Sequence, residues 1–189
     1  GFKIVFTGNI SPAQSFETIL EAAKILKNKG FKDFKWIIVG DGMSRDWLVE
    51  EVKKNGLSDC FFFEGQKPIY DIPKYTEIAD ILVGCLVKSD LLEATIPAKV
   101  TSYIASGKPI VLAMDGEARE LINNKAKCGY AGPTEDSITL AKNITKIYKM
   151  SSKQRKQLGI NAREYHFKYL ERNLILGKLF KFIFDTKTN

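Results

Sequence analysis

Few residues of this chain are suited to redox, metal or hydrolytic chemistry. Of its 189 residues, three are cysteine and one is histidine. Cys60, Cys85 and Cys128 are far apart and form no Cys-x-x-Cys motif, so neither a disulfide framework nor a zinc site is indicated. Because His166 is the only imidazole, a Ser-His-Asp or Cys-His hydrolase would have a single possible base, near the C-terminus. The composition therefore disfavours these classes of enzyme.

Membrane-spanning and targeting signals are also missing. No apolar run reaches the ~18–20 residues of a transmembrane helix, and the first residues are typical of a strand rather than a signal peptide. The hydrophobic share of 44% and the charged share of 27% are ordinary for a soluble globular protein. We expect a cytoplasmic protein whose length suits one α/β domain.

The chain carries an excess of positive charge. It has 29 Lys and Arg against 22 Asp and Glu, a net charge of +7. Such an excess favours phosphorylated ligands, nucleic acid or anionic lipid without choosing among them. Much of it lies in helix-like stretches such as 153–156 and 168–187, where a solvated helix face is the simplest explanation. A nucleic-acid-binding module would also need interleaved aromatic and basic residues or a helix-turn-helix, and neither is evident.

Short apolar runs alternate with helical patterns along the whole chain. Strands are predicted at residues 3–7, 34–39, 61–63, 80–86, 109–113 and 129–131. Helices are predicted at 11–29, 44–55, 72–78, 97–105, 117–123, 137–149, 152–165 and 171–184. This alternation predicts a Rossmann-like, three-layer α/β fold with a parallel sheet and helices on both faces. We assign residues 1–168 to this domain and 169–189 to a C-terminal helical appendage of it.

Ligands of such sheets bind beyond the carboxyl ends of the strands, where two loops contain glycine. Gly8 ends the first strand just before a helix, whose N–H groups and partial positive charge suit a phosphate. The segment matches neither the dinucleotide-binding nor the P-loop pattern. We expect Ser11 to cap this helix and Gln14 to complete a capping box. The second loop, residues 40–42, is the Gly-Asp-Gly of a turn that needs no ligand.

The strongest local feature is Pro97-Ala98-Lys99, followed by the run Ser-Tyr-Ile-Ala-Ser-Gly-Lys-Pro at 102–109. Lys99 falls in the first turn of a predicted helix, where a cation opposes the helix dipole. A residue that local electrostatics disfavours indicates a function, and Lys99 together with helix N–H groups is suited to holding a diphosphate. The alternative is a solvated lysine at a cost of roughly a few tenths of a kcal/mol.

Several motifs follow one another at characteristic distances. They are the Gly8 loop, Ile37–Gly42, Phe63-x-Gly65, Ala79-Asp80, Pro97-x-Lys99 and Tyr103-x-Ala-Ser-Gly-Lys-Pro-Ile110. Their order and spacing resemble the C-terminal domain of the group 1 (family 4) glycosyltransferases, over about residues 2–184. The likeness is strongest to the bacterial branch that builds capsule and O-antigen sugars, which includes amino-sugar transferases.

This resemblance implies the C-terminal half of a GT-B fold, in which two Rossmann-like domains face each other across a cleft. It implies a retaining transferase that moves a sugar from a nucleotide-sugar, expected to be UDP-linked, in cell-surface polysaccharide synthesis. The glycan or lipid-linked acceptor would lie mostly on an N-terminal domain outside this chain, so the isolated half is expected to be inactive. No metal or other cofactor and no nucleic-acid partner are expected, and the parent protein is expected to contact the inner face of the membrane peripherally.

The resemblance also implies a donor site, carried over by position. Its residues are Gly8, Asn9, Gln14, Gly40, Asp41, Gly42, Phe63, Gly65, Pro97, Lys99 and Ser102. The chain departs from the family pattern at the usual Glu-x7-Glu pair, since Ala94 and Ser102 occupy its places and Glu93 lies one step away. It departs again where an arginine and a lysine are usual, because Asn9 and Gln14 stand there.

Lys99 is the residue that can supply the missing phosphate charge, and Glu93 and Lys99 are the candidates for catalytic groups. Two other functions stay open. One is a GT-B-like sugar-nucleotide 2-epimerase, although that reaction needs more acid–base side chains than these loops carry. The other is a non-enzymatic nucleic-acid-binding module, which the net charge alone supports.

Overall fold

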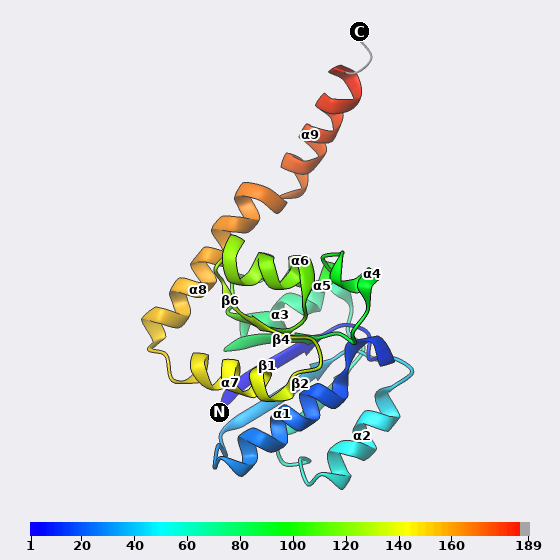
Figure 1. Cartoon of the computed structure of the whole chain (residues 1–189), viewed down its shortest axis with the longest axis vertical. Helices are drawn as coiled ribbons and strands as arrows, with labels where there is room; N and C mark the ends of the chain where they lie inside the picture. Colours follow the sequence, from blue (N-terminus) through cyan, green and yellow to red (C-terminus); the bar gives the residue numbers. More distant parts are fainter. Residues whose placement is uncertain (186–189) are drawn as a thin grey trace.

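The computed structural model describes residues 1–185, built around a six-stranded sheet in the order β3-β2-β1-β4-β5-β6 (Figure 1). Its strands are β1 (Phe2–Thr7), β2 (Phe34–Val39), β3 (Phe61–Gly65), β4 (Ile81–Cys85), β5 (Ile110–Ala113) and β6 (Gly129–Gly132). Every neighbouring pair is parallel. The strand order reverses between β1 and β4, and this switch point is where open α/β sheets bind ligands.

Both faces of the sheet are buried, because successive side chains of a strand point to opposite sides. In β1, Ile4 and Phe6 enter one hydrophobic cluster and Val5 enters the other. Helices α1 (Phe16–Asn28), α2 (Arg45–Lys54) and α7 (Ser137–Tyr148) cover the first face. Helices α3 (Ile72–Glu77), α5 (Ala98–Ser106) and α6 (Gly116–Glu120) cover the second, and α8 (Ser152–Tyr165) packs against α5. The predicted fold class is therefore confirmed.

Short elements complete the described chain. They are 3₁₀ turns at Pro12–Gln14 and Ile69–Asp71, the short helix α4 (Asp90–Glu93), and π turns at Leu121–Lys125 and His166–Leu170. The sequence pattern does not predict them, because segments of five residues or fewer show no helical periodicity.

The expected start of the first helix is wrong. Ser11 makes no side-chain cap hydrogen bond, Pro12–Gln14 form a single 3₁₀ turn, and α1 begins only at Phe16. Ser15 between them takes a left-handed conformation (φ 42°), and its hydroxyl lies 2.8 Å from that of Thr18. Gln14 cannot complete a capping box because its side chain is bonded to a distant lysine, described below.

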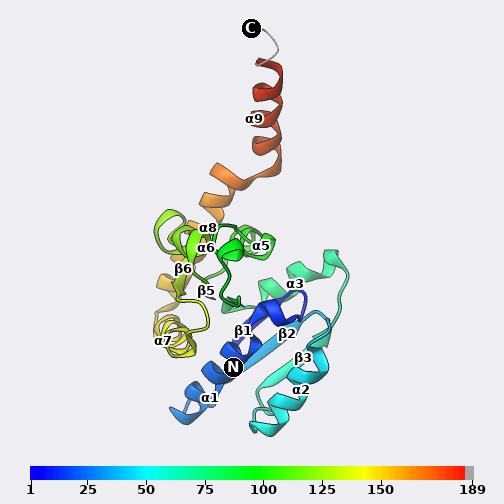
Figure 2. The same ribbon diagram turned by 45° about the vertical axis from the view of Figure 1, so that its right-hand side comes forward.

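The last described helix, α9 (Arg172–Asp185), extends away from the sheet in both views (Figure 1, Figure 2). Extended backbone at Glu171 separates it from the preceding π turn. Its apolar side chains are open to solvent, with Ile175, Leu179 and Phe180 between 46% and 57% exposed. The assignment of an appendage at 169–189 stays a prediction, and its residues 186–189 lie outside the described part of the chain. Within that described part, no helix combines the length and apolarity that a bilayer crossing requires.

Candidate donor-binding groove

Backbone hydrogen bonds join the loops after β1, β2 and β3. The N–H of Gly8 donates to Val39 O (2.9 Å), and the N–H of Gly40 donates to Gly65 O (2.9 Å). A Cβ atom added to Gly40, which has a φ of +140°, would lie 1.9 Å from the carbonyl oxygen of Gly8. The first two loops therefore touch through bare backbone, and only glycine fits at the crossing.

A second crossing lies just beyond the first. The N–H of Ile10 donates to Asp41 O (2.8 Å), and the N–H of Ser44 donates to Ile10 O (3.0 Å). A Cβ atom on Gly42 would lie 2.3 Å from the Ile10 carbonyl oxygen. The glycines of the Gly-Asp-Gly turn are thus required because the two loops pack against each other. A turn that only reversed the chain would not need both.

Two adjoining pockets open beside these loops. The first, of about 450 Å³, is lined by Gly8, Asn9, Val39, Gly40, Asp41, Gly42, Gln66, Lys67 and Ile72. The second, of about 740 Å³, runs between α3 and α5, and its lining includes Thr7, Ile72, Thr76, Ser102 and Tyr103. Because Ile72 lines both, we treat them as one groove at the carboxyl ends of β1 and β2, the candidate for donor binding.

Lys99 reaches the same edge of the sheet from the first turn of α5. Its ammonium contacts Oε1 of Gln14 and lies 3.6 Å from the centre of the Phe6 ring. A Cβ atom on Gly8 would be 3.1 Å from Cε of Lys99. Three predicted site residues therefore lie together: Gly8 and Gln14 from one segment, and Lys99 from a distant one.

Burial lowers the pKa of Lys99 to about 7. Its hydrogen-bond partner is a neutral amide, and no carboxylate in residues 1–185 forms an ion pair with it. A cation enclosed in this way is poorly solvated, and an anion placed beside it would favour its charged form. The position is electrostatically suited to a phosphate.

The other predicted residues are distributed unevenly. Ser102 lines the groove, and its hydroxyl donates to Ala98 O (3.0 Å). Pro97 immediately precedes the first residue of α5. Phe63 packs against the core, and the Glu93 carbonyl lies against Gly116. Neither lines the groove, and the same is true of four other predicted residues: Gln14, Gly65, Pro97 and Lys99. Their assigned roles stay predictions.

Lys67, Gln66 and Thr76 line the groove but are absent from the residues expected from the sequence. Lys67 lies 3.8 Å from a Glu64 carboxylate oxygen, and both side chains are partly exposed. Thr76 lies in α3, whereas Gln66 and Lys67 lie in the loop after β3, which carries no recognisable motif. Its position after a strand is the only sequence signal that points to it.

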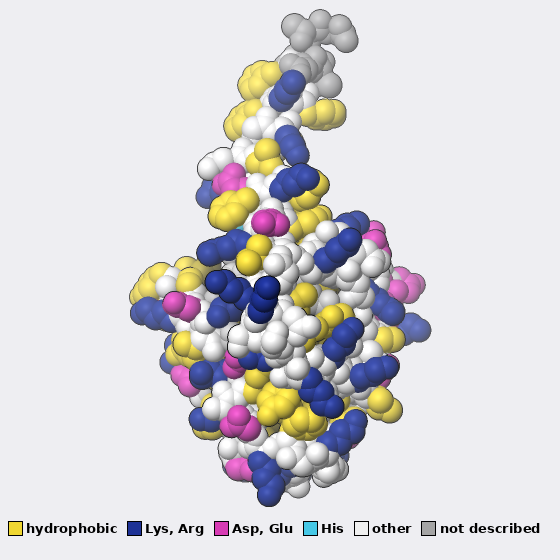
Figure 3. Space-filling view, turned by 90° about the vertical axis from the view of Figure 1, so that its left-hand side faces the viewer, with side chains coloured by type: hydrophobic (Ala, Val, Ile, Leu, Met, Phe, Trp, Pro, Cys, Tyr) yellow, Lys and Arg dark blue, Asp and Glu magenta, His cyan; other side chains and the backbone are white. Residues whose placement is uncertain are grey.

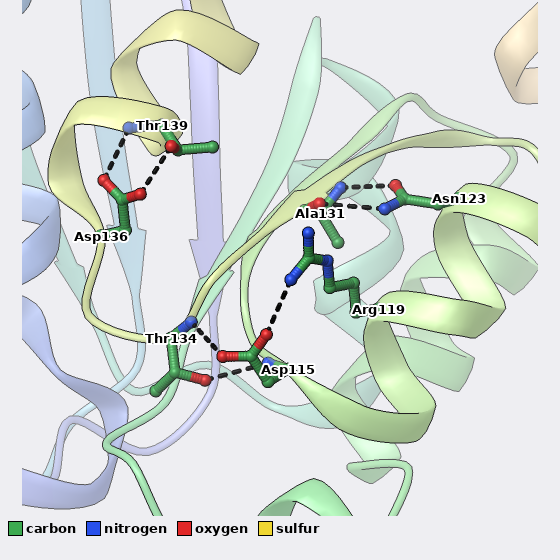
Figure 4. Close-up of polar contacts among 7 residues, drawn as sticks. All are labelled: Asp115, Arg119, Asn123, Ala131, Thr134, Asp136 and Thr139. Atoms are coloured by element: carbon green, nitrogen blue, oxygen red, sulfur yellow. Dashed lines mark hydrogen bonds and ion pairs between the residues drawn. The ribbon is translucent and has the colours of Figure 1, made fainter.

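The loops after β5 and β6 are hydrogen-bonded to each other. The Asp115 carboxylate accepts the N–H of Thr134 and a bond from Arg119 (both 2.9 Å), while the Thr134 hydroxyl accepts the N–H of Asp115 (Figure 4). The hydrogen bond from Thr134 is the main cause of the lowered pKa of Asp115. These groups fix the two loops, which leaves the groove beside β1 as the candidate site.

Among the described residues, no cluster of three or more His, Cys, Asp or Glu is placed to hold a metal ion.

Comparisons with known proteins show the family to which this chain belongs. The family model described as "Glycosyl transferases group 1" matches residues 1–165. The amylovoran biosynthesis glycosyltransferase AmsK of Erwinia amylovora is 29% identical over 140 residues, which cover 74% of this chain and 34% of that protein. The 2-deoxystreptamine glucosyltransferase of Streptomyces kanamyceticus is 29% identical over 134 residues, 64% of this chain and 34% of that protein. The chain thus spans about a third of the length of these relatives.

Two solved structures share the fold. Anabaena Alr3699/HepE in complex with UDP has a TM-score of 0.84 at 18% identity, covering 98% of this chain and 49% of that one. The C-terminal domain of LpcC, a group 1 glycosyl transferase family protein of Francisella tularensis, has a TM-score of 0.74 at 20% identity, covering 90% and 87%. Together with the match to the family model, these likenesses lead to one conclusion: the chain belongs to the group 1 glycosyltransferases.

Proposed function

We propose that this chain is the donor-binding half of a retaining glycosyltransferase. The enzyme would transfer a sugar from a UDP-linked donor to a glycan or lipid-linked acceptor in the synthesis of a cell-surface polysaccharide. The observation that carries the proposal is the enclosed ammonium of Lys99, which lies against Gly8 without a carboxylate partner. A nucleoside diphosphate supplies the counter-charge that this ammonium lacks.

The proposed chemistry places the diphosphate where negative charge develops. As the bond between the anomeric carbon and the diphosphate oxygen breaks, its electron pair stays on that oxygen. The acceptor hydroxyl then forms the new glycosidic bond, and its proton passes to the departing diphosphate oxygen. Lys99, with the N–H groups of the first turn of α5, stabilises the departing diphosphate. Retention of configuration is inferred from the family.

The groove that opens beside Gly8 and Lys99 suits the nucleoside. In the proposed orientation the base lies beside residues 40–42 and Lys67, and the ribose lies near the Ser102 hydroxyl. Asp41 and Glu77 are the carboxylates among the lining residues. A 2-epimerase needs positioned acids and bases at the sugar, so this sparse set favours group transfer.

A second domain would complete the active site. The chain covers 49% of the HepE chain, and the exposed apolar side of α9 is the kind of surface that protein packing covers. We infer that α9 packs against an N-terminal domain that holds the acceptor. Without it, the cleft is open and the acceptor is not positioned.

Titration with nucleotides tests this proposal. We expect UDP and UDP-N-acetylglucosamine, followed by NMR amide shifts at physiological salt, to shift residues 8–14, 40–42 and 99–103, and GDP to shift them less. The same sample is expected to show no sugar transfer to added acceptors. An absence of shifts at millimolar nucleotide, or turnover by this chain alone, would contradict the proposal.

We also propose a peripheral contact with anionic membranes. A groove of about 580 Å³ beside α8, which we call the basic groove, is lined by four basic side chains (Lys108, Arg155, Lys156 and Arg163) and two acidic ones (Asp80 and Glu164). Lys108 and Arg163 also line the candidate donor groove. Lys and Arg side chains outnumber Asp and Glu over this side of the molecule (Figure 3). Each basic residue near an anionic bilayer contributes about 1 kcal/mol, screened by salt.

Flotation with vesicles measures this contact. We expect association with vesicles rich in phosphatidylglycerol, and its loss at high salt. The double variant Lys156→Glu/Arg163→Glu should abolish it, whereas Lys53→Glu/Lys54→Glu on exposed positions of α2 should retain it. Equal binding to neutral and anionic vesicles would count against a charge-driven contact.

A further inference from the structure

The sheet is incompletely paired at its switch point. β1 pairs with β2 from Phe2 to Thr7, but with β4 only at Ile4–Ile81 and Val5–Leu82. The last residues of β1 therefore separate from β4 just before Gly8. Backbone polar groups left open there would be buried, and buried groups of this kind need partners.

The Tyr103 hydroxyl supplies those partners. It accepts the N–H of Thr7 (2.9 Å) and lies 3.2 Å from Val83 O and 3.4 Å from Thr7 O. Because a phenol has one proton, the shorter contact makes Val83 O the better acceptor. The hydroxyl thus bridges β1 and β4 as a peptide group would in a continuous sheet. Tyr103 is 1% exposed, and burial raises its pKa to about 12, so it keeps its proton at neutral pH.

The same helix face carries Lys99. Residues four apart lie on one side of an α-helix, so Lys99 and Tyr103 both face the end of β1. Tyr103 bonds to Thr7, while Lys99 lies against the next residue, Gly8. The hydroxyl therefore fixes α5, and with it the Lys99 ammonium, relative to the backbone of the Gly8 loop.

We infer that Tyr103 is a positioning residue for the nucleotide diphosphate: its hydroxyl bridges β1 and β4 where they separate and fixes the Lys99 ammonium beside the Gly8 backbone, where the two can contact the diphosphate together. This inference rests on the proposed function, because it assumes that a diphosphate binds beside Gly8 and Lys99. It adds a residue that makes no contact with the diphosphate itself.

Tyr103→Phe removes the hydroxyl and keeps the ring. We expect the Thr7 amide to exchange with solvent at least about tenfold faster, and the dissociation constant for UDP to rise about five- to tenfold, as for loss of one buried hydrogen bond. Asn123→Ala is the matched control. Asn123 clamps the backbone of Ala131 in β6 through two hydrogen bonds (2.7 and 2.9 Å; Figure 4) and does not line the groove.

The outcomes separate the two proposals. If Tyr103→Phe weakens UDP binding no more than Asn123→Ala does, Tyr103 is merely structural and the inference is overturned. If the wild-type chain binds no UDP, the proposed function itself fails, and exchange at Thr7 then reports on the bridge alone. If Tyr103→Phe does not fold, the inference is tested on the wild-type protein. Saturation with UDP is then expected to shift the ring resonances of Tyr103 together with the Gly8 amide. Unchanged ring resonances overturn the inference.

Discussion

Lys99→Met is expected to weaken UDP binding by about 10- to 100-fold while making the protein more stable. The loss of affinity follows from removing a charged hydrogen-bond donor, which contributes roughly 1.5–3 kcal/mol. The gain in stability follows from removing an ammonium that the fold holds in an unfavourable environment. Methionine keeps the unbranched stem that passes Gly8, so packing there is little disturbed. We expect a rise of about 2–4 °C in Tm at pH 7, as for 1 kcal/mol in a chain of this size.

The pH dependence of both effects has a definite sign. In the folded protein the Lys99 pKa is lowered from 10.5 to about 7, so between these values the unfolded chain holds a proton that the folded chain has released. The stability of the wild type should therefore rise with pH across this window. UDP-N-acetylglucosamine binds the protonated form, so its affinity should fall as pH rises above about 7.

Calorimetric titrations between pH 6.5 and 9 measure this change in affinity, and thermal melts over the same range measure the stability. Both dependences should be strongly reduced in Lys99→Met. Lys142→Met, at an exposed position of α7, removes one charge elsewhere and should change neither profile. If Lys99→Met binds UDP as tightly as the wild type, Lys99 does not contact the phosphates and the proposed site is misplaced.

Much of the fold was predictable because a doubly covered sheet leaves a strong pattern. Strands buried on both faces appear as short continuous apolar runs, as in Phe34–Val39 and Ile81–Cys85, and the helices between them show one apolar face. The predicted helix and strand boundaries mostly agree with the structure to within one or two residues. The start of α1 differs because Gln14 has a partner 85 residues away, and this distant contact outweighs the local capping pattern.

The site was predictable as a set of loops and not as a set of contacts. Gly8 directly follows a strand and Lys99 lies in the first turn of a helix, and these positions indicate which edge of the sheet they share. That Lys99 reaches Gln14, where family members usually have a lysine, depends on the length and direction of a side chain from another helix. Periodicity carries no information on such a contact. Nor could the contacts of the Tyr103 hydroxyl be predicted from helical spacing. The hydroxyl bonds to the end of β1 only because β1 and β4 separate there.

Gly40→Ala is expected to destabilise the protein by about 3 kcal/mol or more and to abolish nucleotide binding. The added methyl would lie 1.9 Å from the Gly8 carbonyl oxygen, at a φ of +140° that side chains rarely adopt. This clash can be relieved only if the loops after β1 and β2 separate, and that movement breaks the hydrogen bonds that Gly8 and Gly40 make to neighbouring strands. Strain and overpacking of this kind cost about 1–3 kcal/mol each.

Gly30→Ala separates the steric clash from the cost of the backbone conformation. Gly30 also has a positive φ (+82°), but a Cβ atom there would have no atom within 4 Å. Its replacement should cost only about 1 kcal/mol and leave UDP binding intact. Chemical denaturation gives both free energies, and NMR titration gives both affinities. If the two variants lose similar stability and both bind UDP, the contact between the loops does not shape the groove. If only Gly40→Ala loses binding, the Gly-Asp-Gly turn supports the site by holding the Gly8 backbone where the diphosphate needs it.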